Sequence, residues 1–417
     1  MEHPQGRNHA LDTIRAIMFP LGLVLASAES FLPGFAALGW PISDIAPSWG
    51  AARIVFVIHM FRLSIFFLLS GFFAHLVYHR RGAGAYIKDR SKRILIPLVG
   101  GWILFVPLIL LCFAWAMHKR AHGLPAAPTN TNTFNLTHLW FLYYLFWLNL
   151  IVLAVRQLFV RADQSGSLRR QVDRMISFVL NSHLAPLILG LPTAIALYAL
   201  PSWWLWWGIP SPNTSLIPES SSLVAYGTAF SLGWLLHRQA GLIEVWKHRW
   251  PAHLAIASAL TLVDLYIMRR MGVNSAFAVA PGGIATAVYA CVYAVAIWNW
   301  TFALIGIALR FFVGESPLRR YFADSSYWVY FAHLPLVFAL QVALLDLLWP
   351  WELKLATIVL VSYSILILTY HYLVRSTFVG QILNGRRHAR IPLRAVLWPK
   401  GRAPIPQEPV PHVVRPS

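Results

Sequence analysis

Several charged and polar side chains stand inside apolar stretches that are long enough to cross a membrane. The stretch LDTIRAIMFPLGLVLASAES, residues 11–30, carries Arg15 near its start and Glu29 near its end, and the stretch IHMFRLSIFF carries His59 and Arg62. An ionised side chain at the bilayer centre costs at least about 2.5 kcal/mol, so it is expected to face a polar cavity or a charged partner. We therefore predict a polar site between these helices, with Glu29 as a partner for Arg62.

The spacing within the first stretch gives this site a direction. Arg15 and Ala26 are eleven residues apart, which returns them to nearly the same helix face at an axial separation of about 16 Å. Glu29 lies one turn beyond Ala26, within side-chain reach of it. Such a stripe suits a ligand that is anionic at one end and reactive at the other. The alternative is that Arg15 extends to lipid phosphates and that Glu29 only approaches the outer surface.

Two further arginines could hold the anionic end of that ligand. Arg90 and Arg93 close the basic stretch HRRGAGAYIKDRSKRILIP and are three residues apart, on one side of a helix that enters the membrane. Two guanidinium groups on one face can bind phosphates bidentately. Read alone, the same stretch is the cytoplasmic positive charge that membrane proteins commonly carry.

Aromatic and histidine side chains gather at the other ends of the helices. The stretch NLTHLWFLYYLFW contributes His138, Trp140 and Tyr143, and SYWVYFAHLPLV contributes His333. They are typical of an aromatic belt and of packing inside a span, or they line an acceptor site. The run WWLWW at 203–207 indicates an interfacial element, or a surface that stacks on sugar rings.

The composition requires a membrane to hold these helices. Of 417 residues, 58% are apolar and only 12% are charged, which excludes an ordinary soluble domain. Apolar runs of roughly 20 residues recur along the chain. We predict an all-α polytopic membrane protein with about ten spans, at 12–32, 53–78, 94–117, 137–159, 183–201, 222–237, 252–268, 284–309, 325–347 and 353–374. The first run lacks a small-residue cleavage site, so we expect it to be retained as a helix.

The basic residues set the orientation of these spans. With the N-terminus inside, 27 of the 34 Lys and Arg residues fall on the cytoplasmic side, a strong positive-inside asymmetry. Both termini are therefore predicted to be cytoplasmic. The net charge of +19 is then explained by topology and contact with anionic membrane lipids, and we expect no nucleic-acid partner.

The domain organisation is predicted to be simple. Residues 1–385 form one membrane domain, and the basic, Pro-rich segment 386–417 is expected to be a disordered tail. The two cysteines, Cys112 and Cys291, both lie in apolar runs, so neither a disulfide nor a metal site is expected. No internal repeat is evident.

The order of these motifs resembles the membrane acyltransferase 3 family, and within it the group that adds succinyl groups to periplasmic glucans. The resemblance runs from residue 8 to about 387. The matching stretches are LDTIRA, FRLSIFFLLSGFF, residues 88–97, HLWFLYYLFW, AYGTAFSLGWLLHRQ, SYWVYFAHLPL and LVRSTFVGQILNG.

The resemblance implies transfer of an acyl group from cytoplasmic acyl-CoA, here succinyl-CoA, to a hydroxyl of a periplasmic glucan across the bacterial inner membrane. No tightly bound cofactor or metal is implied, and the oligomeric state, a homodimer among the options, stays open. The helix-1 motif of the family is a basic residue, ten residues and a catalytic histidine. Arg15 matches the basic residue, but Ala26 occupies the histidine position.

This departure predicts a catalytically impaired chain, because losing a general base forgoes about 10²–10⁴-fold in rate. The explanation we favour is an engineered variant with alanine in place of the motif histidine. A natural relative that uses His59 or Glu29 as its base is a second explanation, and a degenerate relative with a role in transport or assembly is a third.

The expected mechanism follows from the resemblance and the buried charges. The CoA phosphates would bind Arg15, Arg90 and Arg93, and the reactive end would reach position 26. Arg62 would bind the distal carboxylate of a succinyl group or stabilise the oxyanion, while His138, Trp140, Tyr143 and His333 would contact the acceptor. The rival hypothesis is a transporter or flippase for an anionic lipid or metabolite, although such carriers usually show repeated halves.

Overall fold

The computed structural model describes residues 9–38, 40–120, 135–212, 215–390 and 392, and within these ranges it is helical, without a β-strand. The long helices follow in chain order: α1 His9–Glu29, α2 Trp49–Arg90, α3 Ile96–Lys119, α4 Trp140–Ala162, α5 Ser167–Asn181, α6 Ala185–Tyr198, α7 Ser220–Arg238, α8 Glu244–Arg270, α9 Gly283–Phe311, α10 Pro317–Leu344 and α11 Trp351–Thr369. A short helix, α12 Phe378–Asn384, follows α11. The prediction of an all-α polytopic membrane protein is confirmed.

Each of the ten predicted apolar runs overlaps one of these helices. By length and apolar composition, seven helical stretches of the described chain can cross a membrane, or eight if the bent pair α5 and α6 forms one span. One of the seven, Trp49–Lys119, contains two of the predicted runs, joined through the π-helical turn Ser91–Leu95. The count of ten crossings and the cytoplasmic placement of the termini stay predictions.

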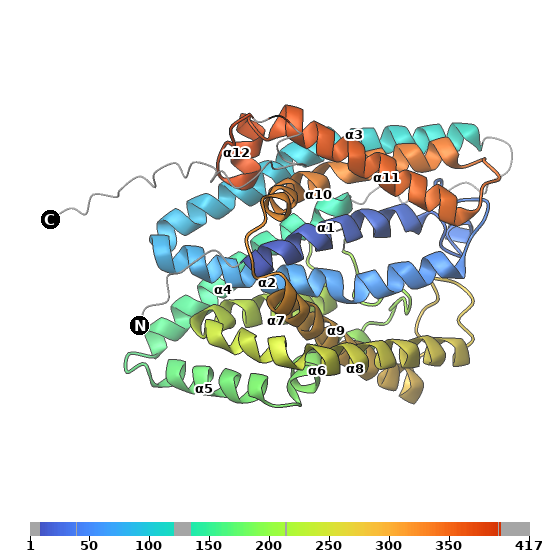
Figure 1. Cartoon of the computed structure of the whole chain (residues 1–417). Coiled ribbons are helices and arrows are strands. Elements are labelled where there is room, and N and C mark those ends of the chain that lie inside the picture. Colours follow the sequence, from blue (N-terminus) through green and yellow to red (C-terminus); the bar gives the residue numbers. More distant parts are fainter. Residues whose placement is uncertain (1–8, 39, 121–134, 213–214, 391, 393–417) are drawn as a thin grey trace.

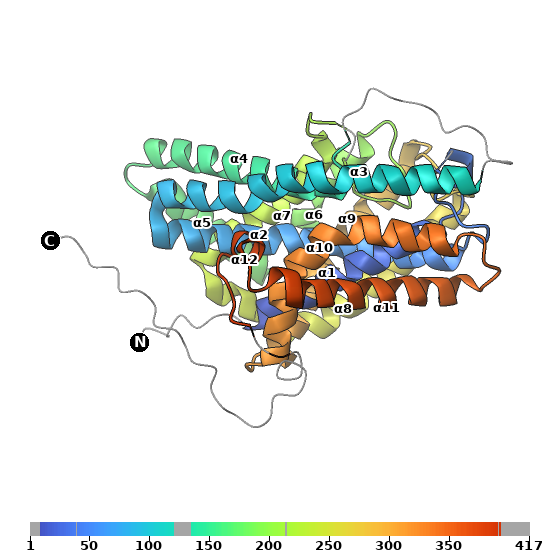
Figure 2. The ribbon, with the colours of Figure 1, turned by 90° about the horizontal axis from the view of Figure 1, so that it is seen from above.

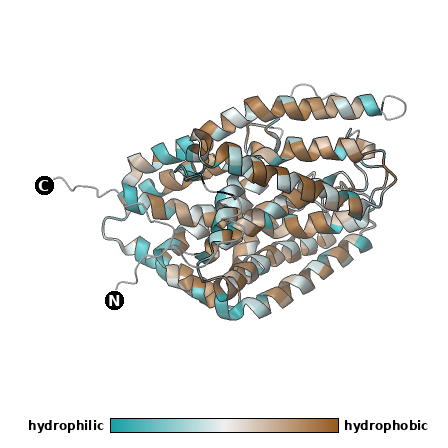
Figure 3. Cartoon of the chain, turned by 45° about the horizontal axis from the view of Figure 1, so that its top comes forward, coloured by the Kyte–Doolittle hydropathy of each residue, from teal (hydrophilic) through white to brown (hydrophobic). Residues whose placement is uncertain are grey.

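The helices that build the site run through the middle of the molecule. Figure 1 shows α1 and α2 side by side, with α3, α10 and α11 on one side of them and α7 to α9 on the other. Figure 2, seen from above, shows α3 as an outer helix beside α10. The closest helix pairs are α1 with α10, α2 with α7, and α8 with α9. Most of the helical ribbon consists of hydrophobic residues (Figure 3), as expected for helices that cross a membrane.

Helix α2 has two features that its glycines explain. Gly82 has a positive φ of 74° and breaks α2, a conformation that glycine adopts without a steric penalty. Gly71 of α2 and Gly233 of α7 bring the two backbones into contact, since a Cβ at either position would overlap a carbonyl oxygen of the opposite helix, that of Phe230 or Leu68. Small residues at such crossings are typical of membrane helices.

We expect Gly71→Ala and Gly233→Ala each to destabilise the protein by about 1–3 kcal/mol, because the added methyl meets backbone that cannot move aside. Gly100→Ala in α3 is the matched control, because nothing lies within 4 Å of its Cβ position and alanine is the better helix former. Thermal unfolding in detergent measures all three. Equal melting temperatures would contradict the close crossing.

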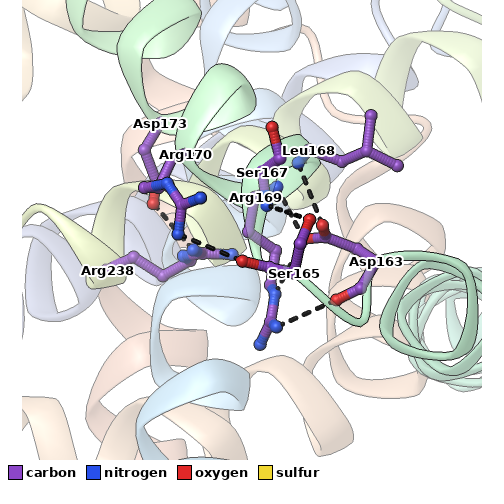
Figure 4. Close-up of polar contacts among 8 residues, drawn as sticks. All are labelled: Asp163, Ser165, Ser167, Leu168, Arg169, Arg170, Asp173 and Arg238. Atoms are coloured by element: carbon purple, nitrogen blue, oxygen red, sulfur yellow. Dashed lines mark hydrogen bonds and ion pairs between the residues drawn. The ribbon is translucent and has the colours of Figure 1, made fainter.

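Polar contacts tie the amphipathic helix α5 to its neighbours (Figure 4). Asp163 follows α4 and accepts hydrogen bonds from the backbone N–H groups of Leu168 and Arg169, at 3.0 and 2.9 Å, and from Nε of Arg169 at 3.0 Å. At the other side of α5, Asp173 pairs with Arg238 at the end of α7 at 2.7 Å. Burial raises the pKa of the Asp163 carboxyl, but the hydrogen bonds from Arg169 and Leu168 together outweigh it and hold the pKa below its ordinary value.

Because this pKa is lowered on folding, ionised Asp163 stabilises the fold above its unfolded pKa of about 4, and the contribution is lost as the pH falls further. Asp163→Asn is therefore expected to lower the melting temperature at pH 7, with a difference from the parent that shrinks toward pH 3. Melting curves of both proteins across this range measure it. A constant difference at all pH values would show that the charge is not the cause.

The chain after α11 folds back onto α10. Arg386 and His388 approach Asp324 at 3.9 and 3.6 Å, and Arg375 donates a hydrogen bond to the carbonyl of Ala389 at 2.7 Å. The first residues of the predicted tail thus contact the membrane domain, whereas 391 and 393–417 lie outside the described residues.

Candidate functional site

A cavity of about 190 Å³ lies among α1, α2, α3, α4 and α10, with the loop before α7 on one side. It collects most of the residues predicted to form the site. Those that line it are Ala26, Glu29, His59, Arg62, His138, Trp140 and His333.

Arg62 is the charged centre of this cavity. Its side chain reaches α1 beside Gly22, where a Cβ would overlap the guanidinium. Tyr226, Glu29 and Tyr330 all interact with it electrostatically, but no ion pair within 4.0 Å joins Glu29 and Arg62 in the chain as described. The Nε of Arg62 is buried without a hydrogen-bond partner. The guanidinium therefore has one donor that no residue of the described chain satisfies.

The approach of Arg62 to α1 depends on the missing side chain of Gly22. We expect Gly22→Ala to push the flexible end of the Arg62 side chain aside and to destabilise the protein by about 0.5–1.5 kcal/mol, the cost of an off-rotamer side chain. The effect should be smaller in an Arg62→Met background, where the side chain is shorter. A double-mutant cycle on melting temperatures measures this coupling. Gly227→Ala, whose Cβ would make only an ordinary contact with Leu148, serves as the control. An equal effect of Gly22→Ala in both backgrounds would refute the contact.

His59 lies beside the tryptophan-rich loop. Its Nε2 is 3.3 Å from Oγ of Ser211, to which Nε1 of Trp207 donates at the same distance, and its ring is 5.4 Å from that of Trp207. The Nδ1 of His59 is buried without a partner. One tryptophan of the WWLWW run thus faces the cavity with Ser211 and Trp40, while Trp203 lies buried against Tyr289.

His138 and His333 form a second polar group. Nε2 of His138 lies 3.0 Å from the carbonyl of Phe331, and Nδ1 of His333 lies 2.6 Å from that of Tyr330. Because a carbonyl only accepts, each of these ring nitrogens carries the proton. In its neutral form His333 therefore has Nε2 as its acceptor atom. Thr137, which also lines the cavity, has a positive φ of 50°, a strained conformation for a β-branched residue.

Four aromatic rings close one side of the cavity. Phe19 contacts Phe66 and Tyr330 with centroids 4.3 and 5.9 Å apart, and Phe141 contacts the same two rings at 5.9 and 5.6 Å. They come from α1, α2, α4 and α10, and all four line the cavity. We call this set of four side chains the aromatic layer.

Arg15, Arg90 and Arg93 do not line the cavity. Arg93 and Arg15 lie close enough to Arg90 to act on it electrostatically, so the three guanidinium groups are neighbours, and their role in donor binding stays a prediction. Arg15 is one turn before Phe19 on α1, so Phe19, a member of the aromatic layer, lies between Arg15 and Ala26 along this helix. The cavity does not extend to this cluster, so the continuous path expected from the sequence is not seen among the residues that line it.

The cluster also has partners of its own. Arg93 pairs with Asp89 at 3.1 Å, and its guanidinium packs against Gly385, the residue that directly follows α12. Arg90 stacks on Tyr86 at 5.4 Å from the ring centroid, with its Nε buried and unpartnered. Phosphate binding by Arg93 therefore requires the segment after α12 to move aside or to share the guanidinium.

Tyr143 lies outside the cavity. Its hydroxyl donates to the carbonyl of Leu216, and its ring packs against Tyr144 and Trp147. Tyr143 therefore does not face this cavity, and its contact with an acceptor stays a prediction. Conversely, sequence reasoning did not single out the cavity residues Trp40, Ser211 and Tyr330. Tyr330 sits one turn before His333 on α10, and this spacing is the signal that could have found it.

These features define a polytopic helical membrane protein with a polar, aromatic-walled cavity inside its membrane domain. The family of acyltransferase domains known as acyltransferase 3 matches residues 9–371, and the chain belongs to this family.

Curated relatives carry the name glucans biosynthesis protein C. The protein of that name from Salmonella schwarzengrund (strain CVM19633) is 26% identical over 174 residues, which cover 40% of this chain and 43% of the relative. The one from Salmonella typhi matches to the same extent, and that of Salmonella paratyphi B is 25% identical. The chain thus aligns with less than half the length of these relatives. No solved structure matches it.

Proposed function

We propose that this acyltransferase moves an acyl group from acyl-CoA, entering from the cytoplasm, to a hydroxyl of an extracytoplasmic acceptor. The observation that carries the proposal is the location of Ala26, the position of the motif histidine. It lines the same cavity as Glu29, His59 and Arg62, at the end of the helix whose start carries Arg15.

The donor would bind in two parts. Its phosphates would interact with the cluster of Arg15, Arg90 and Arg93, where charge-assisted hydrogen bonds are strong. The uncharged pantetheine arm would pass through the aromatic layer to bring the thioester to position 26. Since these four side chains contact one another, they would have to separate to let the arm pass between them in each donor cycle.

The chemistry is attack of the acceptor oxygen on the thioester carbonyl. The C–O bond forms, the C–S bond breaks, and the hydroxyl proton passes through a general base to the departing CoA thiolate. Arg62, with its unpartnered Nε, would stabilise the oxyanion or bind a distal carboxylate of the acyl group. With alanine at position 26 the base must come from His59, Glu29 or His333, and we expect slow transfer.

The resemblance to the glucan-modifying relatives favours a succinyl group and a periplasmic glucan, in the inner membrane of a bacterium. The aromatic side chains of Trp40, Trp140 and Trp207 line the cavity and offer faces on which a sugar ring can stack. His138 also lines the cavity, with its ring centroid 5.2 Å from that of His333.

Ala26→His is expected to raise succinyl transfer to a glucan in membranes by about 10²–10⁴-fold, since it supplies a general base at the motif position. Ala26→Asn is the matched control, a polar side chain of comparable size that cannot act as a base. Labelled glucan product measures the rate. If the histidine variant folds, binds CoA and stays at the background rate, the catalytic assignment fails.

Donor binding can be tested in the chain as it stands. We expect CoA to raise the melting temperature in detergent, and Arg15→Ala to weaken this effect because one phosphate contact is lost. A transporter of another anionic solute would show no response to CoA. In the Ala26→His background, Arg62→Met should impair succinyl transfer more than acetyl transfer if Arg62 binds the distal carboxylate, and both equally if it stabilises the oxyanion.

A further inference from the structure

The carbonyl groups at the end of α1 have a partner from another helix. A helix leaves its last four carbonyls without partners inside the regular helix. In α1, the carbonyls of Ala28 and Glu29 accept hydrogen bonds from the N–H groups of Phe31 and Leu32, both at 3.1 Å. The carbonyls of Ala26 and Ser27 accept from the side-chain amide of Gln341, at 2.9 and 3.1 Å.

Gln341 belongs to α10 and is buried, with 3% of its surface exposed. Its amide nitrogen has two hydrogens, so one group serves both carbonyls. The same helix supplies His333, Leu334 and Phe338 to the cavity wall. Gln341 thus joins the end of the helix that carries position 26 to the helix that carries His333.

We propose that Gln341 is a positioning residue that fixes position 26 and Glu29 relative to the opposite wall of the cavity. It does not line the cavity, so it acts through the backbone of α1 rather than on a substrate. In an interior of low dielectric constant, two hydrogen bonds to carbonyls of adjacent residues fix both the axial position of the last turn of α1 and its rotation about the helix axis.

The need for such a clamp follows from the surroundings of this turn. Just beyond it, the chain leaves the helix, and the side-chain oxygens of Ser27 and Ser30 are buried without partners. No other side chain in the described part of the chain is recorded as donating to the carbonyls of Ala26 or Ser27. Beyond the turn, the carbonyls of Ser30 and Phe31 accept hydrogen bonds from the N–H groups of Asp44 and Ser48, both at 2.8 Å. These bonds hold the chain after α1, but they do not reach the carbonyls of Ala26 and Ser27, so loss of Gln341 is expected to loosen the last turn and to displace residue 26 and Glu29.

The first test needs no enzymatic activity. In detergent, Gln341→Met keeps the size of the side chain but cannot donate a hydrogen bond. Amide hydrogen exchange in a peptide that covers residues 23–35 should be about tenfold faster or more than in the parent. The matched control is Asn299→Leu, which removes another buried amide, bonded to Val295 and His253 in α9 and α8, and should leave this peptide unchanged. Unchanged exchange in Gln341→Met would overturn the proposal.

The second test rests on the proposed function and measures transfer in the Ala26→His background. Gln341→Met should lower kcat by about tenfold or more with little change in KM for the donor, since a displacement of about 1 Å can cost 10²-fold. Asn299→Leu should lower the melting temperature without this loss of kcat. An intact kcat in Gln341→Met would overturn the positioning role. If Ala26→His itself shows no transfer, the proposed function fails, and the exchange experiment still decides the role of Gln341.

Discussion

Burial of the Arg62 guanidinium in a membrane domain constrains the centre of this structure. A charge at this depth requires polar surroundings, and α1 supplies them on one side through Gly22 and Glu29. Tyrosines of α7 and α10 lie on the other sides. No partner within ion-pair distance neutralises Arg62 in the described residues. Arg62 and position 26 line the same cavity, and the Nε of this cation has no hydrogen-bond partner.

Much of the helical architecture could be predicted because membrane spans leave a strong signal in hydropathy. The apolar runs located the helices that hold the site, and the resemblance to the acyltransferase 3 family is confirmed over residues 9–371. The helix α5 was not predicted, because it is amphipathic and contains no apolar run. It is positioned by Asp163 and Asp173 (Figure 4), contacts that only the fold brings together.

The candidate site shows the same division. Helical spacing indicated that Arg15, position 26 and Glu29 lie along one side of a helix. The free-energy cost of placing polar or charged side chains in a bilayer singled out His59 and Arg62. Residues of irregular segments, such as Ser211, carry no periodic pattern and could not be placed in this way. Gln341 was missed for a different reason. Its importance lies in which two carbonyls it reaches, and that depends on how α10 packs against α1.

The aromatic layer affects how the membrane potential would act on a donor. Four packed aromatic side chains leave little room for water between them, and in a membrane part of the transmembrane voltage would fall across such a layer. In the proposed mechanism, the polyanionic end of the CoA donor would stay on the cytoplasmic side of this layer. A carboxylate at the tip of the acyl group would cross it, and an inside-negative potential drives an anion outward by about 2.3 kcal/mol per 100 mV. Delivery of a charged acyl group would thus be driven by the transmembrane potential, whereas delivery of a neutral acyl group would not depend on it.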